Sequence, residues 1–515
     1  MPTAERAAGI VCPLFALGGR RDWGIGEIGH LPTFCRWLAD AGHRVLQLLP
    51  TFETSAGERS PYAALTAFAL DPIYLSLDAV EDFAAAGGEA ALGAARESAH
   101  AGGDIDYDAV RAAKRRALEV AFARFVATEW EHGSARAEAF RRFRAAEAAW
   151  LDDYALFRAL RERHAGRSWT AWEPSLRARL PAALAEARDT LAPARLFHEY
   201  VQWVVAEQWA AARREATAHG VRLMGDLPFM VSADSADVWA RQDEFARDPS
   251  LGAPPDQFDL GGQDWGLPVY RWEVMARNDH AWLRGRVARA AALFAAVRLD
   301  HVVGFYRQFV IPSAGPRHFV PAEEAEQLAL GERLLGVVRA AAGSAGVTGE
   351  DLGVVPDFVR RSLATLAIPG YRVLRWESDG GVFRDPAGFP PLSVATSGTH
   401  DTSALAIWWE EELGADGRRA LAAVPSFGRL AGAGAAFTPG VHEALLDGLY
   451  GARSALVVLP FPDAYGGRER INVPGTVGPP NWGYRLPWTV DDLWGRTGAA
   501  LRDRLRALAA RHGRS

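Results

Sequence analysis

The chain has little of several things that would place it in a particular environment. Its 515 residues include only two cysteines, Cys12 and Cys35, which makes a disulfide framework implausible and fits reduced thiols. No run of about 18 apolar residues occurs, so no membrane-spanning helix is expected. Residues 1–8 lack the basic-then-apolar pattern of a signal peptide. These absences together predict a cytoplasmic protein.

Lysine is almost missing as well. Lys114 is the only one, and arginine supplies the other basic side chains. The net charge of −6 does not indicate a nucleic-acid partner. Alanine and glycine are abundant, so the arginine excess is attributed to codon composition and not to an arginine-based binding surface.

Several catalytic and cofactor motifs are also absent. No GxGxxG follows a predicted strand with an acidic residue about 20 positions later, and GxSxG is missing, which argues against a dinucleotide fold and a serine hydrolase. Asp226, Asp300 and His301 could be drawn as a hydrolytic metal site. However, the chain has no HxxxH, no CxxC and no calcium-loop motif, so no metal is expected.

What the chain does have is a series of strand-like segments, most of them separated by helical patterns. Eight candidates are predicted, at residues 43–50, 72–77, 221–231, 292–305, 344–352, 371–376, 392–399 and 455–461. This alternation predicts an α/β fold, a (β/α)8 TIM barrel.

Tryptophan is abundant, at 18 residues. Most of these side chains will pack in the core, but indole rings also stack on sugars.

The segments divide the chain into three parts. Residues 1–81 hold the first strands and a Gly-rich segment, residues 82–215 form a mostly helical inserted subdomain, and residues 216–515 complete the barrel. Helices are predicted at about 31–41 and at 107–127, 135–163 and 196–219. Residues 248–266 and 463–488 are predicted as substrate loops. The tail after residue 488 is too short for a C-terminal β-sandwich domain.

Three acidic residues, Asp300, Glu350 and Asp401, each follow a strand-like segment. A parallel barrel places such residues at one mouth, where catalytic groups lie. Converging carboxylates suit a retaining glycosidic mechanism, which needs a nucleophile and an acid/base. Arg298, two residues before Asp300 on the same face, would keep that carboxylate ionised.

Several of these residues also have a structural interpretation. Arg298 and Asp300 could be an ion pair inside the barrel, and the Asp of His400-Asp401 could cap a turn. Asp226, at another strand end, could contact substrate or be a structural anion.

Taken together, these residues resemble the amylomaltases, the 4-α-glucanotransferases or disproportionating enzymes of glycoside hydrolase family 77. The resemblance runs nearly end to end, in blocks whose order and spacing make it specific. These blocks are residues 23–27, 60–62, 67–69, 150–157, 225–228, 234–239, 254–272, 472–476 and 481–482, with the three acidic strand ends.

The resemblance implies roles for individual residues. Asp300 would be the nucleophile, Glu350 the acid/base, and Asp401 a ligand of ring hydroxyls that stabilises the transition state. The resemblance further implies transfer of α-1,4-glucan segments between maltooligosaccharides, with no metal or organic cofactor. Residues that would support or line the glucan site are Arg298, His400, Tyr62, Asp226, Trp265, Asp256, Asn472 and Asn481.

The chain departs from the family pattern at several positions. Val302 and Val303 replace Phe-Arg, Thr402 replaces Asn, Gln257 replaces a loop Tyr, and residues 57–59 replace Tyr-Gly-Asp. Donor length and the ratio of transfer to hydrolysis are therefore open. Two alternatives stay open as well: a retaining α-glucan hydrolase with the same carboxylates, and a non-catalytic glucan-binding protein.

Overall fold

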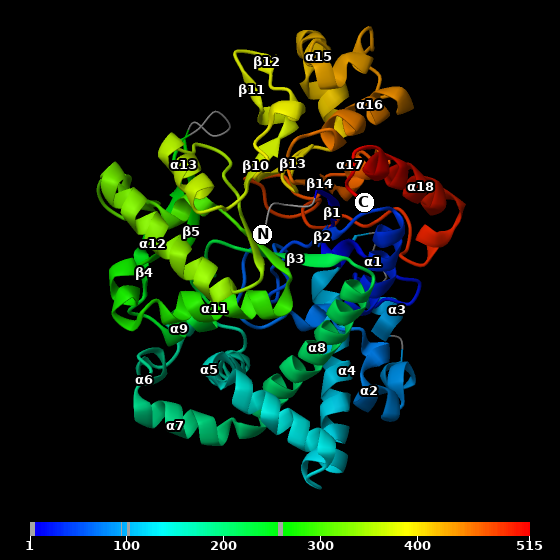
Figure 1. Cartoon of the computed structure of the whole chain (residues 1–515). Coiled ribbons are helices and arrows are strands. Elements are labelled where there is room, and N and C mark those ends of the chain that lie inside the picture. Colours follow the sequence, from blue (N-terminus) through cyan, green and yellow to red (C-terminus); the bar gives the residue numbers. More distant parts are fainter. Residues whose placement is uncertain (1–5, 94, 100–103, 256–260) are drawn as a thin grey trace.

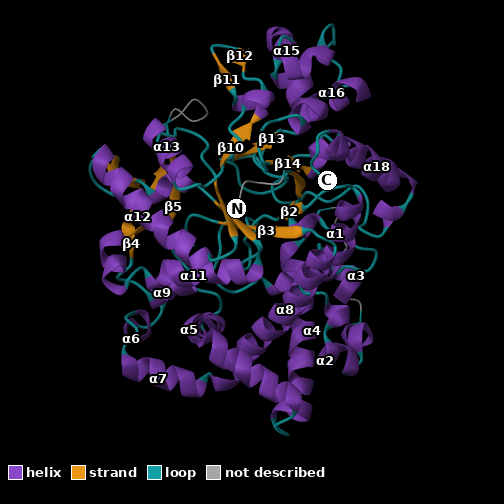
Figure 2. Ribbon diagram, in the orientation of Figure 1, coloured by secondary structure: helices purple, strands orange, loops and turns teal. Residues whose placement is uncertain are grey.

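The computed structural model describes residues 6–93, 95–99, 104–255 and 261–515 (Figure 1). At its centre lie eight parallel strands in the order β10-β13-β14-β1-β2-β3-β6-β9. Helices surround these strands (Figure 2). The strands are β1 (Ala7–Val11), β2 (Val45–Gln47), β3 (Arg222–Leu227), β6 (Ala296–Leu299), β9 (Gly346–Gly349), β10 (Gly370–Val373), β13 (Ser393–Thr396) and β14 (Leu456–Pro460).

The two edges of this sheet meet and close it. The N–H of Gly349 in β9 donates to Pro369 O, just before β10, at 2.9 Å. Beside it, the N–H of Tyr371 donates to the Asp351 carboxylate at 2.6 Å. Closure removes the exposed edges that an open parallel sheet would have. The predicted (β/α)8 barrel is confirmed.

The predicted strand at 72–77 is wrong, and the first strand of the barrel was missed. Asp71 accepts a hydrogen bond from Ile73 N and Pro72 follows it, so the chain turns into the 3₁₀-helix η3 (Pro72–Tyr74). The missed strand is β1, whose sequence AAGIV carries only a weak β signal. It is held in place by parallel pairing with β14 and β2, which no local pattern reveals.

Between β2 and β3, a loop over residues 48–71 is followed by a stretch whose described residues from 81 to 218 are mostly helical and lie beside the barrel (Figure 1). The helices predicted at 107–127, 135–163 and 196–219 are confirmed as α4, α5 and α8, while the division of the chain into three parts stays a prediction. The helices of this stretch are α2 (Glu81–Ala85), α3 (Ala95–Ala99), α4 (Tyr107–Phe125), α5 (Ala135–Arg163), α6 (Pro174–Arg177), α7 (Pro181–Thr190) and α8 (Ala192–Ala218).

The stretch 248–266, predicted as a long loop, is largely a β-hairpin. Strands β4 (Phe245–Ala253) and β5 (Gln263–Tyr270) pair antiparallel, and β7 (Gln308–Ile311) and β8 (His318–Val320) extend them into a four-stranded sheet. The proline and glycine residues suggested a loop, but register shifts near Ser250 and Leu251 accommodate them as bulges do. Residues 256–260, including Asp256 and Gln257, lie outside the described residues.

The remaining regular elements complete the outer layer. The predicted helix at 31–41 is α1 (Leu31–Asp40). In the described residues, no helix has the length and apolar character needed to cross a membrane. The other helices and strands are α9 (Ala236–Ala240), α10 (Trp272–Met275), α11 (Ala281–Leu293), α12 (Glu324–Ala342), α13 (Asp357–Thr365), β11 (Ser378–Asp379), β12 (Val382–Phe383), α14 (Leu405–Ile407), α15 (Gly414–Ala422), α16 (Pro439–Tyr450), α17 (Phe461–Tyr465) and α18 (Arg496–Arg511).

Candidate active site

Acidic residues gather at the carboxyl ends of the barrel strands. Asp226 belongs to the end of β3, Asp300 follows β6, and Glu350 follows β9, and these three strands are neighbours in the sheet. Asp401 lies five positions beyond the end of β13. All four groups therefore belong to the mouth where a parallel barrel places reacting groups.

Asp300 lies beside a guanidinium group, as its sequence position predicts. Arg298 Nη1 donates to Asp300 Oδ1 at 3.2 Å, and the N–H of Phe229 donates to the other oxygen at 3.3 Å. Arg298 binds the Asp226 carboxylate more tightly, with Nη1 at 2.7 and 2.6 Å from its two oxygens. The Asp226 side chain has no exposed surface, which favours the structural-anion interpretation for this residue.

Glu350 lies in a different electrostatic environment. Burial is the largest effect and the charge of Asp300 acts in the same direction, so the pKa of Glu350 rises to about 8. The guanidinium of Arg298 and the backbone N–H of His301 oppose this rise. The latter donates to Glu350 Oε2 at 2.8 Å. A carboxyl group with such a pKa carries its proton at neutral pH, as a general acid requires.

The Asp401 side chain is more exposed than that of Asp300, which is 24% exposed, and is therefore more accessible to a ligand. Its side chain is 39% exposed, and Asn472 Nδ2 donates to its Oδ1 at 2.6 Å. His400 Nε2 lies 3.4 Å from its other oxygen. The N–H of Asn472 also donates to His400 O at 3.0 Å, so the predicted residues His400, Asp401 and Asn472 form one connected group.

Tyr62, in the loop after β2, contacts residues that follow other strands of the barrel. Its ring stacks on His400, with ring centroids 5.2 Å apart and an interplanar angle of 16°. Its hydroxyl donates to Asp226 Oδ2 at 2.8 Å. Burial and the neighbouring Asp226 charge raise the pKa of Tyr62 well above its ordinary value, so the hydroxyl stays a donor.

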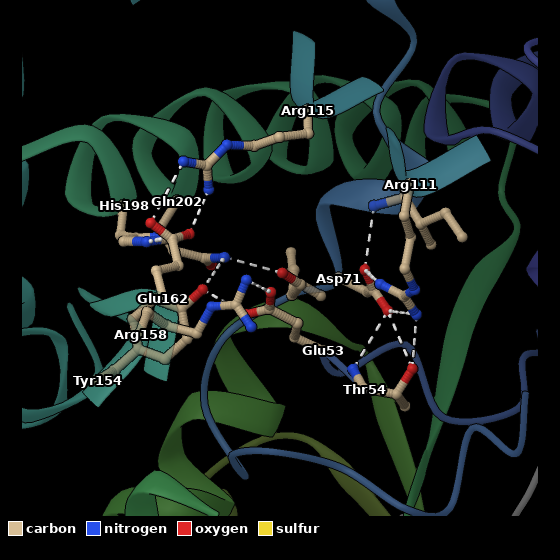
Figure 3. A network of polar contacts seen from close by, with 12 residues as sticks. Glu53, Thr54, Asp71, Arg111, Arg115, Tyr154, Arg158, Glu162, His198 and Gln202 are labelled. Atoms are coloured by element: carbon tan, nitrogen blue, oxygen red, sulfur yellow. Dashed lines mark hydrogen bonds and ion pairs between the residues drawn. The ribbon is translucent and has the colours of Figure 1, made fainter. Parts of the chain in front are cut away.

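A buried polar network anchors the loop that carries Tyr62 (Figure 3). Nη1 and Nη2 of Arg111 in α4 each donate to one oxygen of the Asp71 carboxylate at 2.9 Å. Nη2 also donates to Thr54 Oγ1 at 2.6 Å, and Asp71 accepts from Thr54 N at 3.2 Å. Residues 54 and 71 flank the Tyr62 segment, so this clasp closes the loop at its base and fastens it to α4.

A second part of the network reaches α5 and α8 (Figure 3). The Glu53 carboxylate accepts from the hydroxyl of Tyr154 and lies 3.3 Å from Arg158, both in α5. Gln202 of α8 donates to Tyr154 Oη at 3.3 Å. Three helices of the helical stretch thus support the loop after β2.

The remaining predicted residues take different positions. Trp265 in β5 packs edge-on against His301, with centroids 4.9 Å apart. Asn481 uses its amide within its own loop: Oδ1 accepts from Val473 N at 2.9 Å, and Nδ2 donates to Thr476 O at 3.0 Å. Its predicted substrate contact, like that of Asp256 outside the described residues, stays a prediction.

Some residues of the site were not identified from the sequence. Phe229 N binds Asp300, and His301 N binds Glu350. The Arg298 guanidinium lies 5.8 Å from the centroid of the Tyr371 ring, and Arg470 donates to Asp401 O at 2.6 Å. A backbone N–H donor cannot be recognised from the residue type. Among these residues, only His301 could have been identified from the sequence, because it directly follows Asp300. Among the described residues, no group of three or more His, Cys, Asp or Glu side chains could hold a metal ion.

With this geometry in place, comparison with known proteins is decisive. The family model described as 4-alpha-glucanotransferase, Glyco_hydro_77, matches residues 12–490. The chain belongs to the 4-α-glucanotransferase family, glycoside hydrolase family 77. The resemblance drawn from the sequence motifs is confirmed.

Individual members of the 4-α-glucanotransferase family agree over long stretches. A 4-alpha-glucanotransferase of Thermus thermophilus is 36% identical over 416 residues, covering 78% of this chain and 80% of its own. One from Chlamydia pneumoniae is 30% identical over 500 residues, covering 94% and 92%. Among solved structures, the amylomaltase from Streptococcus agalactiae in complex with acarbose superimposes with a TM-score of 0.85 at 25% identity, covering 99% of this chain and all of that one.

Proposed function

We propose that this barrel mouth transfers α-1,4-glucan segments between maltooligosaccharides by double displacement, with Asp300 as nucleophile and Glu350 as acid/base. The observation that carries the proposal is the contrast between the two carboxylates. Asp300 is bound by Arg298 at 3.2 Å, whereas the pKa of Glu350 is raised to about 8. One group is thereby suited to attack and the other to donate a proton.

In the first step, an Asp300 oxygen attacks the anomeric carbon of the donor while the bond from that carbon to the glycosidic oxygen breaks. Glu350 gives its proton to the departing oxygen. In the second step, ionised Glu350 takes the proton of the acceptor's 4-hydroxyl, which attacks the same carbon and releases Asp300. Two inversions return the original α configuration.

Asp401, with Asn472 and His400 beside it, is proposed to bind ring hydroxyls and stabilise the oxocarbenium-like transition state. Its 39% exposed side chain is open enough to accept hydrogen bonds from sugar. Tyr62 and Trp265 are proposed to line the glucan site, because aromatic faces pack against the C–H surface of pyranose rings. An acceptor sugar that excludes water from the intermediate would favour transfer over hydrolysis. A cytoplasmic location is proposed on the sequence composition.

Pure maltotriose, supplied without cofactor and followed by chain length over time, tests the proposal. Glucose together with a ladder of longer maltodextrins is the expected result. Glucose and maltose alone, with reducing ends rising, would instead establish the hydrolase alternative.

The variant D300N distinguishes catalysis from binding alone. It is expected to lower kcat by about 10⁴-fold or more, because the covalent step loses its nucleophile. If wild type and D300N bind maltooligosaccharide equally and neither turns it over, the chain is a glucan-binding protein.

A further inference from the structure

The segment that carries His400 and Asp401 lies between β13 and α14 and contains no helix or strand. Strand pairing therefore does not hold it. Apart from the hydrogen bond that Asn472 N donates to His400 O, its position depends mainly on side-chain contacts. Besides Arg470 and Asn472, which bind Asp401, two buried side chains of opposite charge from neighbouring barrel units supply such contacts. They are Arg375, in the 3₁₀-helix η10 (Leu374–Trp376) after β10, and Asp463, in α17 after β14.

Asp463 holds the two ends of the segment together. Ser397 Oγ donates to Asp463 Oδ2 at 2.6 Å, and the N–H of Leu405 donates to Oδ1 at 2.7 Å. The residue is only 1% exposed, so water cannot replace these bonds. One carboxylate thus bridges residues on both sides of the His400–Asp401 pair.

Arg375 holds the same segment from the opposite neighbour. Its Nε donates to Ser397 O at 3.2 Å, Nη1 to Ser403 Oγ at 2.9 Å, and Nη2 to Ser403 O at 3.0 Å. Its side chain is 5% exposed. These bonds involve the planar fork of the guanidinium, which sets direction as well as distance.

Inside this frame the turn is closed by Thr402. Its hydroxyl donates to Thr399 O at 3.0 Å and accepts from Thr399 N at 3.1 Å. A Cβ atom at Gly398 would lie 2.3 Å from Thr402 Oγ1 and 3.1 Å from Arg375 Nη2. Glycine is therefore required there by the close approach of the turn and the guanidinium.

We infer that Arg375 and Asp463 are positioning residues for catalysis, which fix His400 and Asp401 against the substrate without touching it. Asp463 is 1% exposed and the Arg375 side chain 5%, whereas 39% of the Asp401 side chain is exposed. A shift of about 1 Å in a reacting group can lower the rate by about 10²-fold, so such a frame affects turnover as well as stability. This inference rests on the proposed function of Asp401.

The test compares the kcat and KM of D463A, D463N and R375M on maltotriose, at a temperature where each variant is folded. D463A and R375M are expected to lower kcat/KM by about 10²-fold. D463N is expected to recover activity to within about fivefold of wild type, because its amide can accept from Leu405 N and donate to Ser397 Oγ. The milder S397A, which removes one hydroxyl, replaces D463A if that variant does not fold, with an expected loss of about fivefold.

The control and a double-mutant cycle separate positioning from general stability. Asp82 is likewise fully buried and bound by two arginines and a tyrosine, but in α2 of the helical stretch. D82N is expected to lower the melting temperature and leave kcat within about twofold of wild type. In an N472A background, Asp401 has already lost its hydrogen bond to Asn472. There D463A should lower kcat/KM by a much smaller factor than in wild type, because both substitutions act on the position of Asp401.

The inference is overturned if folded D463A and R375M keep kcat/KM within about twofold of wild type. It is also overturned if the fold-loss in kcat/KM of the D463A/N472A double variant equals the product of the two single-variant losses. Failure of the proposed function looks different. In that case wild type does not disproportionate maltotriose, or the single variant D401N turns it over normally.

Discussion

The backbone N–H of His301, the residue directly after Asp300, donates a 2.8 Å hydrogen bond to Glu350 Oε2. The proposed acid/base is therefore held by the chain of the proposed nucleophile, across the pairing of β6 with β9. His301 adopts a left-handed backbone with φ of 47°, which is uncommon outside glycine. This conformation accompanies the sharp turn that aims its N–H at Glu350.

Activity is expected to fall with rising pH because of Glu350. Its pKa is raised to about 8 by burial, so the protonated fraction needed for the first step declines as pH rises through that value. A profile of kcat/KM for maltotriose against pH checks this. A basic limb centred near pH 5 would contradict the assignment.

The ionisation of Glu350 should also lower the free energy of unfolding as pH rises. The pKa of Glu350 is about 8 in the native protein against an ordinary 4.5, so stability present at low pH is lost as pH rises from 4.5 through 8. E350Q keeps an acceptor for His301 N without ionising. It should raise the free energy of unfolding by about 4 kcal/mol at pH 8 and leave it nearly unchanged at pH 4. Urea unfolding at both pH values measures the difference.

Y62F is expected to lower kcat/KM by about tenfold, because it loses the hydroxyl bond to the buried Asp226 carboxylate but keeps the ring on His400. Steady-state kinetics on maltotriose measure the loss. Y200F is the matched control, since Tyr200 also donates to a buried carboxylate, Asp82, at 2.8 Å but far along the chain from the mouth. Equal losses in both variants would show that the Tyr62 effect is general destabilisation.

R111M should destabilise the protein by about 3 kcal/mol, because it leaves the Asp71 carboxylate, 3% exposed, without its guanidinium partner. Urea unfolding measures the change. The double variant D71N/R111M should recover part of the loss, since no charge is then left unpaired. If the double variant is less stable than R111M alone, the clasp on the Tyr62 loop is not the cause.

Asn472 offers a test of the Asp401 environment. N472A removes the 2.6 Å hydrogen bond to Asp401 and is expected to lower kcat/KM by about 10- to 100-fold. N472D should be worse, because it places a second carboxylate at the same distance. Kinetics on maltotriose rank the two. An N472D variant as active as wild type would remove Asn472 from the site.

Much of this protein was accessible from local patterns. Seven of the eight barrel strands arise from short apolar segments, and the acidic residues after three of them indicated the mouth. The false strand at 72–77 and the hairpin mistaken for a loop have a common cause. Proline and glycine mark a change of direction, but the same residues occur in a capped 3₁₀ turn and in bulged strands.

By itself, the sequence determined the barrel class, the family and the residues that end its strands, because periodicity and motif order are properties of the linear chain. Only the tertiary structure decided which groups meet. It paired β1 with β14, placed Arg298 on Asp226, and brought Arg375 and Asp463 to opposite sides of one segment. These contacts join residues that are remote in sequence, and the burial that raises the pKa of Glu350 arises only when the whole barrel closes around it.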